Sequence, residues 1–188
     1  NELEQLNLRK NTLIIFASDN GAAIQAPIKI LNCNAGFKGR KGTLYEGGIR
    51  VPFIVNQPGM VPIQTLDNLI YFPDMMPTLA ALAKGTKHLP KQINGINILP
   101  LFYGKQVDTD NRLLYWEFPG KQRAARKGDW KCVTIHPNQP LELYNLKEDP
   151  EETNNLAKKY PRRVKEFDEE MQRMHIPTPN WPQPGEQF

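Results

Sequence analysis

The feature that most constrains the fold is a run of apolar residues that is continuous rather than alternating. It covers residues 13–16, and the chain turns polar at Asp19-Asn20-Gly21. A continuous run of this length is typical of a strand covered on both faces, as in the parallel sheet of an α/β protein. Open α/β sheets bind ligands at the carboxyl ends of their strands. We therefore predict an α/β domain in which Asp19 and Asn20 lie at the ligand-binding edge.

The second half of the chain carries a different pattern, one of short apolar segments separated by turn pairs. The turn pairs are Pro119-Gly120, Gly128-Asp129 and Pro137-Asn138. Segments of this kind favour an antiparallel sheet whose strands are joined by hairpins. Residues 161–174 then place apolar side chains at helical spacing, at Val164, Phe167, Met171 and Met174. We predict an α/β sheet domain over residues 1–108, followed by a small α+β domain over residues 109–188 with an antiparallel sheet, a C-terminal helix and an extended tail.

Three local predictions concern the first domain. The opening segment is expected to be the end of a helix that stops at Asn11, because asparagine tolerates the left-handed conformation. Pro52 indicates an edge strand or the first residue of a strand. Residues 72–85 have helical spacing and are expected to end at Gly85, with one apolar face formed by Met76, Leu79, Ala80 and Ala83.

The composition narrows the class of partner. The chain has 188 residues, a net charge of +4 and a pI of about 9.0. Its basic residues form three clusters: Lys38, Arg40, Lys41 and Arg50; Arg123, Arg126, Lys127 and Lys131; and Lys158, Lys159, Arg162 and Arg163. Such clusters favour an anionic partner. The aromatic residues are not interleaved with lysines as in a base-stacking surface, so we expect no nucleic acid. The apolar runs are too short to cross a bilayer, so we expect no membrane partner.

The cysteines and histidines do not have the spacing of a metal site. Cys33 and Cys132 lie far apart in the sequence, which leaves open one disulfide or two separate thiols. The histidines are scattered, and we expect them in loops or on the surface; they are His88, His136 and His175.

Two interpretations of Asp19-Asn20-Gly21 are open. Asn-Gly after an apolar strand is a strong signal for a hairpin turn. The segment that follows, residues 22–34, pairs poorly with the strand, however, since it lacks alternation and contains a proline. In the second interpretation, the carboxylate of Asp19 and the amide oxygen of Asn20 are hard oxygen ligands for Ca²⁺ or Mg²⁺.

The glycine-rich basic stretch KGRKGTLYEGG, residues 38–48, also has two interpretations. It does not follow the order of a Walker phosphate loop, and a solvated basic loop is the simplest alternative. Its glycines nevertheless permit close backbone approach to a ligand. An ammonium such as that of Lys41 suits a tetrahedral oxyanion, sulfate or phosphate, on which charge grows during reaction.

Together these stretches resemble the sulfatase family. The resemblance also includes the helix YFPDMMPTLAALA, the strand RAARKGDWKCV and the run LELYNLKEDPEETNNLA, which occur in the order found in that family. It covers nearly the whole chain and corresponds to the C-terminal third to half of a sulfatase. The resemblance implies an alkaline-phosphatase-like fold, in which residues 1–108 form the end of a doubly wound sheet.

The resemblance also implies roles for individual residues. Sulfatases hydrolyse sulfate esters with a formylglycine nucleophile beside a divalent cation, usually Ca²⁺, with Mg²⁺ as the alternative. By resemblance, Asp19 and Asn20 are two ligands of that cation, and Lys41 is the catalytic lysine that contacts the sulfate group. The expected substrate is a sulfated small molecule or glycan.

Four other matching residues are expected to be structural. Glu46 and Arg50 are four residues apart, so we expect them to pair with each other and to take no catalytic role. Arg126 and Trp130 lie in a strand that borders the substrate entrance in relatives. We expect a structural role for both of them rather than contact with the substrate.

One family motif does not occur in this sequence. The nucleophile belongs to Cys/Ser-x-Pro-Ser-Arg, whereas Cys33 is followed by Asn-Ala-Gly and Cys132 by Val-Thr-Ile. We therefore expect the formylglycine in a missing N-terminal part of the parent protein, and we expect this chain alone to be inactive. The uncovered strand at residues 13–16 should lead to self-association or to pairing with the missing half. By resemblance the parent is expected to be periplasmic or secreted, although this chain carries no targeting segment.

Two other functions remain open at this point. Phosphodiesterases and phosphonate hydrolases of the same superfamily share the fold but usually hold two metals with further Asp and His ligands. A basic module without catalytic activity that binds sulfated glycans is the other alternative.

Overall fold

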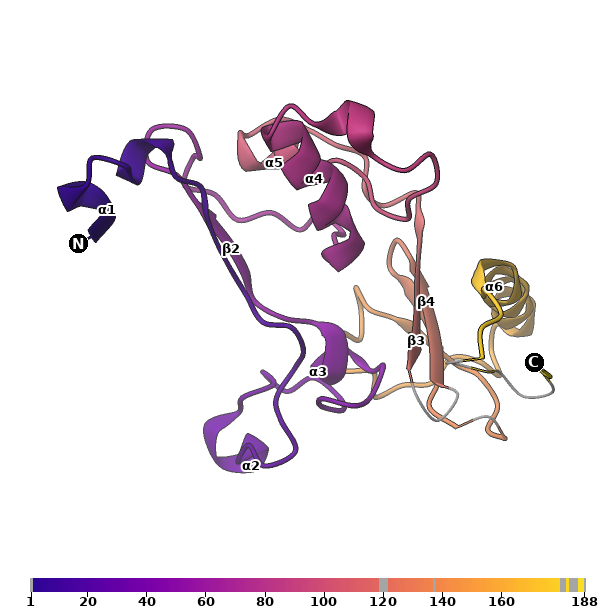
Figure 1. Cartoon of the computed structure of the whole chain (residues 1–188). Coiled ribbons are helices and arrows are strands. Elements are labelled where there is room, and N and C mark those ends of the chain that lie inside the picture. Colours follow the sequence, from indigo (N-terminus) through magenta and orange to yellow (C-terminus); the bar gives the residue numbers. More distant parts are fainter. Residues whose placement is uncertain (1, 119–121, 137, 180–181, 183–185, 188) are drawn as a thin grey trace. The chain divides into compact units, whose positions relative to one another are not determined.

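The computed structural model describes residues 2–118, 122–136, 138–179, 182 and 186–187. The chain forms two compact units that alternate along the sequence (Figure 1). The first unit contains residues 1–17 and 52–111, and the second contains residues 18–51 and 112–188. The predicted domain division after residue 108 stays a prediction.

The first unit is built from short elements. They are α1 (Glu2–Gln5), β1 (Ile14–Ala17), β2 (Phe53–Asn56), α4 (Met75–Leu82) and α5 (Leu99–Phe102), with 3₁₀ helices at Arg9–Asn11, Phe72–Asp74 and Thr86–His88. Strand β2 begins directly after Pro52, in agreement with the expectation for that proline. The core of this unit consists of Ile98, Leu101 and Phe102, against which side chains from both strands pack.

Strand β1 differs from the parallel strand that the sequence predicts. It pairs antiparallel with β2, in a register that runs from Ile14 opposite Asn56 to Ala17 opposite Phe53. Its burial alternates: Ile15 packs against the core, whereas Phe16 on the other face is 60% exposed. The apolar run is continuous because both faces are apolar, but within the described residues only one face is covered.

The two predicted helix ends of this unit also need correction. Helix α1 ends at Gln5, and the residue in the left-handed conformation after it is Asn7 (φ 55°) instead of Asn11. Helix α4 ends at Leu82 and is followed by Lys84 in the left-handed conformation (φ 55°), one residue before Gly85. Asparagine tolerates this conformation, so the reason was right for the first helix and the position was wrong.

The buried face of α4 is also different from the predicted one. Met76 and Leu79 are exposed, whereas Pro77 and Thr78 are buried. The hydroxyl of Thr78 accepts a hydrogen bond of 2.9 Å from the backbone N–H of Ile98. Apolar spacing identifies an apolar face, but the position of the neighbouring chain decides which face is covered.

The second unit is an antiparallel sheet of four strands with a long helix. Its elements are α2 (Ile28–Leu31), α3 (Glu46–Ile49), β3 (Leu113–Phe118), β4 (Gln122–Lys127), β5 (Trp130–Thr134), β6 (Glu142–Asn145) and α6 (Pro161–Met174). The strands pair in the order β3-β4-β5-β6, as predicted. The turn at Gly128-Asp129 joins β4 to β5. Pro119-Gly120 and Pro137 of the other two predicted turns lie outside the described residues.

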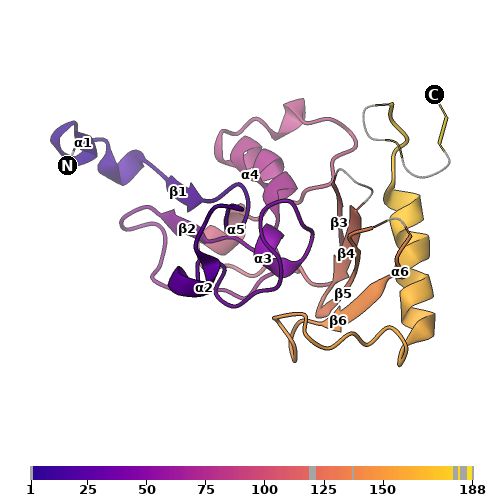
Figure 2. The ribbon, with the colours of Figure 1, turned by 90° about the horizontal axis from the view of Figure 1, so that it is seen from below.

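The two faces of this sheet are covered by different segments, because successive strand residues point to opposite faces. Ala125, Cys132 and Leu143 face α6, which buries Phe167 and Met171 against them. Ala124, Val133 and Tyr144 face the other way and contact Leu44 and Tyr45. Figure 2 shows α6 and α3 on opposite sides of the sheet. Helix α6 has the predicted bounds and the predicted apolar face.

The two cysteines are free thiols, one exposed at Cys33 and one buried at Cys132. Burial raises the pKa of the Cys132 thiol to about 12, so it stays protonated at neutral pH and is unreactive. In the part of the chain that the structure describes, no helix has the length and apolar character needed to cross a bilayer.

Candidate active site

Asp19 and Asn20 form a local polar turn directly after β1. The hydroxyl of Ser18 donates a hydrogen bond of 2.8 Å to the backbone oxygen of Asn20, and the amide nitrogen of Asn20 donates one of 2.8 Å to Oδ1 of Asp19. The following residues form turns and the short helix α2, and the strand before the turn pairs with β2. The pair therefore does not join two strands of a hairpin.

Two backbone hydrogen bonds join this turn to the glycine-rich loop. The N–H of Gly21 donates to the oxygen of Gly48 at 2.9 Å, and the N–H of Lys41 donates to the oxygen of Ala22 at 2.9 Å. The contact at Gly21 requires glycine, since a Cβ there would lie 1.9 Å from the backbone oxygen of Gly47. The acid–amide pair and the loop that carries Lys41 are thus adjacent within one compact unit.

The donor set of the turn fits part of a site for a hard cation. The hydrogen bond within the pair uses only Oδ1 of Asp19 and the amide nitrogen of Asn20. One carboxylate oxygen and one amide oxygen remain as ligands of the kind that Ca²⁺ and Mg²⁺ prefer. No group of three or more His, Cys, Asp or Glu side chains that could hold a metal occurs among the described residues. The described residues would therefore supply only some of the ligands of such an ion.

The loop around Lys41 has a fixed backbone and an exposed lysine. Gly39 and Gly42 on either side have positive φ angles of 81° and 92°. The hydroxyl of Thr43 accepts from the N–H of Arg40 at 3.2 Å and donates to the oxygen of Arg40 at 2.9 Å. Lys41 itself is exposed. Its ammonium is therefore available to an anionic group, as the proposed catalytic role requires.

A buried ionic network anchors the segment after this loop. Lys131 is 0% exposed, and its ammonium lies 2.8 Å from Oε1 of Glu46 and 2.9 Å from Oε1 of Glu152. The backbone N–H of Glu46 donates to Oε2 of Glu152 at 2.6 Å. Three charged side chains thus connect the start of α3 to β5 and to the segment after β6.

The pKa values of the two carboxylates in this network are shifted in opposite directions. Burial acts to raise the pKa of Glu46, but the ammonium of Lys131, together with the guanidinium groups of Arg126 and Arg50, outweighs burial and holds that pKa below its ordinary value. Burial dominates at Glu152 and raises its pKa. The buried ammonium and the two guanidinium groups therefore keep Glu46 ionised at the position where the loop joins the sheet.

A second polar cluster holds the other end of the loop. Lys38 donates a hydrogen bond of 2.9 Å to the hydroxyl of Tyr144, and its ammonium lies 3.5 Å from Glu142. The hydroxyls of Tyr45 and Tyr144 each donate to Oε2 of Glu142 at 2.7 Å. Burial, followed by these hydrogen bonds, raises the pKa of both tyrosines, so both remain neutral donors. The loop is therefore fixed to the sheet on both sides of Lys41.

The residues expected to be structural have structural contacts. Arg50 lies 3.5 Å from Glu46, as the spacing of four residues predicts. Arg126 donates to the backbone oxygen of Gly128 at 3.0 Å. Trp130 packs edge-to-face on Tyr160, with 5.3 Å between the ring centroids.

His175 lies in the loop directly after α6, in agreement with the expectation of a loop or surface position; its ring is half-buried there between two carboxylates, 2.5 Å from Glu117 and 2.6 Å from Glu186. The expectation for one cluster of basic residues needs correction. The cluster of basic residues at 123–131 is largely internal, because Lys131 is buried and Arg123 lies 3.5 Å from Asp168. Side chains of these cations point into the unit and are neutralised there, so the cluster as a whole does not face a partner.

Sequence reasoning missed Lys131, Glu152 and Glu142 as residues that position the loop. A signal existed for Lys131, which lies between Trp130 and Cys132 in a strand that is otherwise largely apolar. A lysine at such a position needs a buried carboxylate partner. No comparable signal exists for Glu152, since its partner is distant in the sequence.

Comparison with known proteins gives a consistent result. Residues 37–176 match the family model described as N-sulphoglucosamine sulphohydrolase, C-terminal. A sulfatase of Formosa agariphila is 32% identical over an alignment that covers 82% of this chain and 30% of the relative. An N-acetylgalactosamine-6-O-sulfatase of Bacteroides thetaiotaomicron is 30% identical and covers 90% of this chain and 37% of the relative. The chain spans about a third of the length of these curated relatives.

A solved structure gives the same result at the level of the fold. It comes from work on the metabolism of glycosaminoglycans by Bacteroides thetaiotaomicron, and it superposes with a TM-score of 0.78 at 29% identity. The match covers 91% of this chain and 40% of that structure. A crystal structure of Ps i-CgsB in complex with a neocarrahexaose superposes with a TM-score of 0.77 at 26% identity and covers 97% of this chain and 41% of that structure.

Proposed function

The chain belongs to the sulfatase family, and from this premise we propose that it is the C-terminal part of an enzyme that hydrolyses sulfate esters of a glycan. The observation that carries the proposal is the pair of backbone hydrogen bonds that joins the Asp19-Asn20 turn to the Lys41 loop. These bonds join the segment that carries Asp19 and Asn20 to the loop that carries the exposed Lys41, which supports the proposal that the three side chains act together. Such a combination suits an ester that is negatively charged and bound beside a cation.

Each residue has a defined role in the proposal. Asp19 and Asn20 would bind the divalent cation, Ca²⁺ or Mg²⁺, and further ligands would come from elsewhere in the parent protein. When bound, such an ion supplies a Lewis acid that polarises the sulfate ester. Lys41 would contact the sulfate oxygens and stabilise the negative charge that develops on them as the S–O bond breaks. The nucleophile, formylglycine in this family, would lie outside this chain.

A sulfated glycan is the proposed substrate because of the relatives. One relative is named N-acetylgalactosamine-6-O-sulfatase and another is named endo-4-O-sulfatase. The exposed cations of the Lys41 loop are compatible with a polyanionic chain. We also propose that the parent is periplasmic or secreted, in line with the family resemblance.

The apolar face of the β1–β2 pair supports a proposal about assembly. Phe16 is 60% exposed and Ile54 is 58% exposed on the face that the first unit leaves uncovered. Leaving such side chains in water forfeits roughly 1.5–3 kcal/mol each. We propose that the rest of the parent protein, or a second copy of this chain, covers this face.

The test is substitution of Lys41 in the full-length parent. Lys41→Met should lower kcat for a sulfate ester by about 10²–10³-fold, the effect of removing one group that stabilises charge in the transition state. Lys87→Met, an exposed lysine in the other unit, is the matched control and should keep the parental kcat. An unchanged kcat for Lys41→Met would overturn the proposed role. The 188-residue chain alone should give no turnover of an aryl sulfate.

A further inference from the structure

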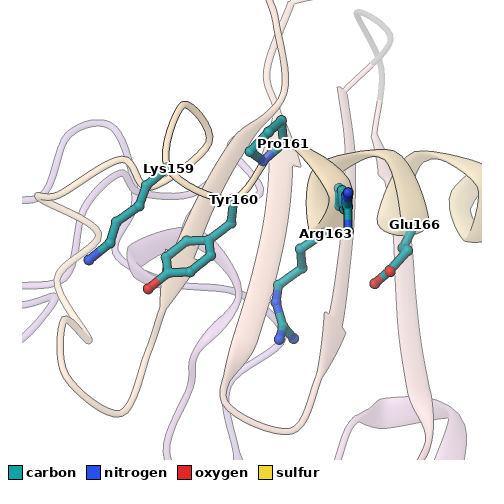
Figure 3. Close-up of a pocket in the computed structure, with 6 residues that line it drawn as sticks. Lys159, Tyr160, Pro161, Arg163 and Glu166 are labelled. Carbon is teal, nitrogen blue, oxygen red and sulfur yellow. The ribbon is translucent and has the colours of Figure 1, made fainter.

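A second basic region lies at the start of α6. A surface hollow of about 390 Å³ is lined by Lys159, Tyr160, Pro161, Arg162, Arg163 and Glu166. Figure 3 shows the side chains of Lys159, Tyr160, Arg163 and Glu166 around this hollow. Three of its six lining residues are cations and only one is an anion, so a negatively charged ligand is the chemistry that the hollow favours.

The cations of this region have no carboxylate partners in the described part of the chain. Lys158, Lys159, Arg162 and Arg163 are all exposed, and none of them forms an ion pair there. The cluster at 123–131 differs, because its Lys131 and Arg123 are paired within the unit. The first turn of α6 also contains no acidic residue, although the helix dipole favours one at this end. The mutual repulsion of these cations is therefore not relieved within the described chain, and a bound anion would relieve it.

Aromatic rings contact two of these cations, and the ammonium of Lys159 lies 5.4 Å from the centroid of the Tyr160 ring. The guanidinium of Arg163 lies 4.3 Å from the centroid of the Trp130 ring, which itself packs against Tyr160. Stacking restricts the guanidinium before a ligand arrives and leaves its N–H groups at the surface. A planar guanidinium presents two parallel N–H groups that can donate to two oxygens of a tetrahedral anion, whereas a lysine ammonium acts as a point charge without this fixed geometry.

The hollow lies on the other side of the sheet from the proposed catalytic loop. Trp130 and α6 belong to the face of Cys132, whereas the segment after Lys41 packs on the face of Val133. A ligand in the hollow therefore does not occupy the site of the Lys41 loop. A polymer with many anionic groups could bind to both places.

We propose that this hollow is an accessory site that binds sulfate groups of a glycan chain away from the catalytic site. The choice of a sulfated glycan rests on the proposed function, whereas the preference for an anion rests on the hollow itself. Binding at two places on one polymer raises the effective concentration of its sulfate esters near the catalytic loop. Long chains should gain affinity from the accessory site, and small sulfate esters should not.

The test compares two double variants of the full-length parent that lose the same charge. Lys159→Gln with Arg162→Gln changes the hollow without removing the stacked Arg163, and Lys87→Gln with Lys91→Gln changes exposed lysines of the other unit. Affinity for a long chondroitin sulfate or heparin chain is measured by titration calorimetry at low and at physiological ionic strength. The hollow variant should bind roughly tenfold more weakly, the effect of losing one or two charge-assisted contacts. The control variant should keep the parental affinity.

Further measurements separate this proposal from the others. The kcat for a small aryl sulfate should be the same in the parent and in the Lys159→Gln, Arg162→Gln variant. A kcat for this variant as low as that of Lys41→Met would mean that the hollow belongs to the catalytic site, and would overturn the proposal. Equal losses in the two double variants, or no loss in either, would overturn it as well. Double-stranded DNA that competes as well as the sulfated glycan would show general polyanion binding and contradict the glycan assignment. Failure of the proposed function would instead leave Lys41→Met fully active, whatever the glycan affinity.

Discussion

The two faces of the four-stranded sheet are held by different kinds of contact. On one face, α6 packs Phe167 and Met171 onto apolar strand residues. On the other, the segment after Lys41 combines apolar packing with a buried ammonium, Lys131, between two carboxylates. Apolar packing tolerates small shifts, whereas an ion network of this kind is stable only in one geometry. The difference indicates that both faces contribute stability, whereas only the loop face also fixes the position of the candidate site.

The largest loss of stability in this comparison is expected from substitution of Lys131. Lys131→Met removes the cation that pairs with Glu152 and the nearest cation to Glu46, which keeps Arg50 at 3.5 Å and Arg126 at 3.9 Å, and should lower the free energy of unfolding by about 3–5 kcal/mol. Met171→Ala on the opposite face should cost about 2–5 kcal/mol through a cavity. Urea denaturation of the full-length parent measures both losses.

Catalytic activity should differ between the Lys131→Met and Met171→Ala variants. At a temperature where both variants remain folded, Lys131→Met should lower kcat/KM for a sulfate ester because the Lys41 loop is displaced, and Met171→Ala should not. Lys127→Met, an exposed lysine of β4, is the control for the charge and should resemble the parent. Equal activity of the Lys131 and Met171 variants would contradict the division of roles between the faces.

Substitution of His175 is expected to change the free energy of unfolding by a smaller amount. This residue follows α6, and its ring contacts two carboxylates next to the apolar face of the sheet. Burial lowers the pKa of His175, but the hydrogen bonds to Glu117 and Glu186 and the negative charges of these two carboxylates together raise it more, so the net shift is upward. A group whose pKa is raised on folding stabilises the fold below its ordinary pKa, about 6.5, and loses that contribution as pH rises through the raised value. His175→Gln should therefore cost roughly 1 kcal/mol at acidic pH and almost nothing at alkaline pH.

Thermal unfolding across this pH range measures the His175 effect. His136→Gln, at an exposed position, is the matched control and should change little. A destabilisation by His175→Gln that is the same at every pH would mean that the two carboxylates do not hold a proton on the ring.

The elements that the sequence predicted well are those decided by local pattern. Helix α6 and the antiparallel sheet follow from spacing and from turn residues that lie within a few positions of each other. The antiparallel partner of β1, the covered face of α4 and the burial of Lys131 depend on residues distant in the sequence. The spacing of Met76 and Leu79 could not reveal that the chain around Ile98 packs on Thr78 instead.

The residues of the candidate site also fall into a group that the sequence predicts and a group that it does not. Asp19, Asn20 and Lys41 were predicted from residue type and from the resemblance to the sulfatase family, and backbone hydrogen bonds at the neighbouring Gly21 and Ala22 join the two segments that carry them. The residues that hold the loop were not found, because Glu152 and Glu142 become its partners only after the sheet has formed. The roles of Asp19, Asn20 and Lys41 remain predictions that binding and kinetic measurements can test.

The most direct test of the account is a calcium titration of the full-length parent by calorimetry. Asp19→Ala should weaken calcium binding by at least about tenfold, since even indirect partners of a metal contribute that much. Asp67→Ala, an exposed carboxylate in the other unit, should leave calcium affinity unchanged. Parental calcium affinity in Asp19→Ala would contradict the claim that the acid–amide turn beside the Lys41 loop binds the cation.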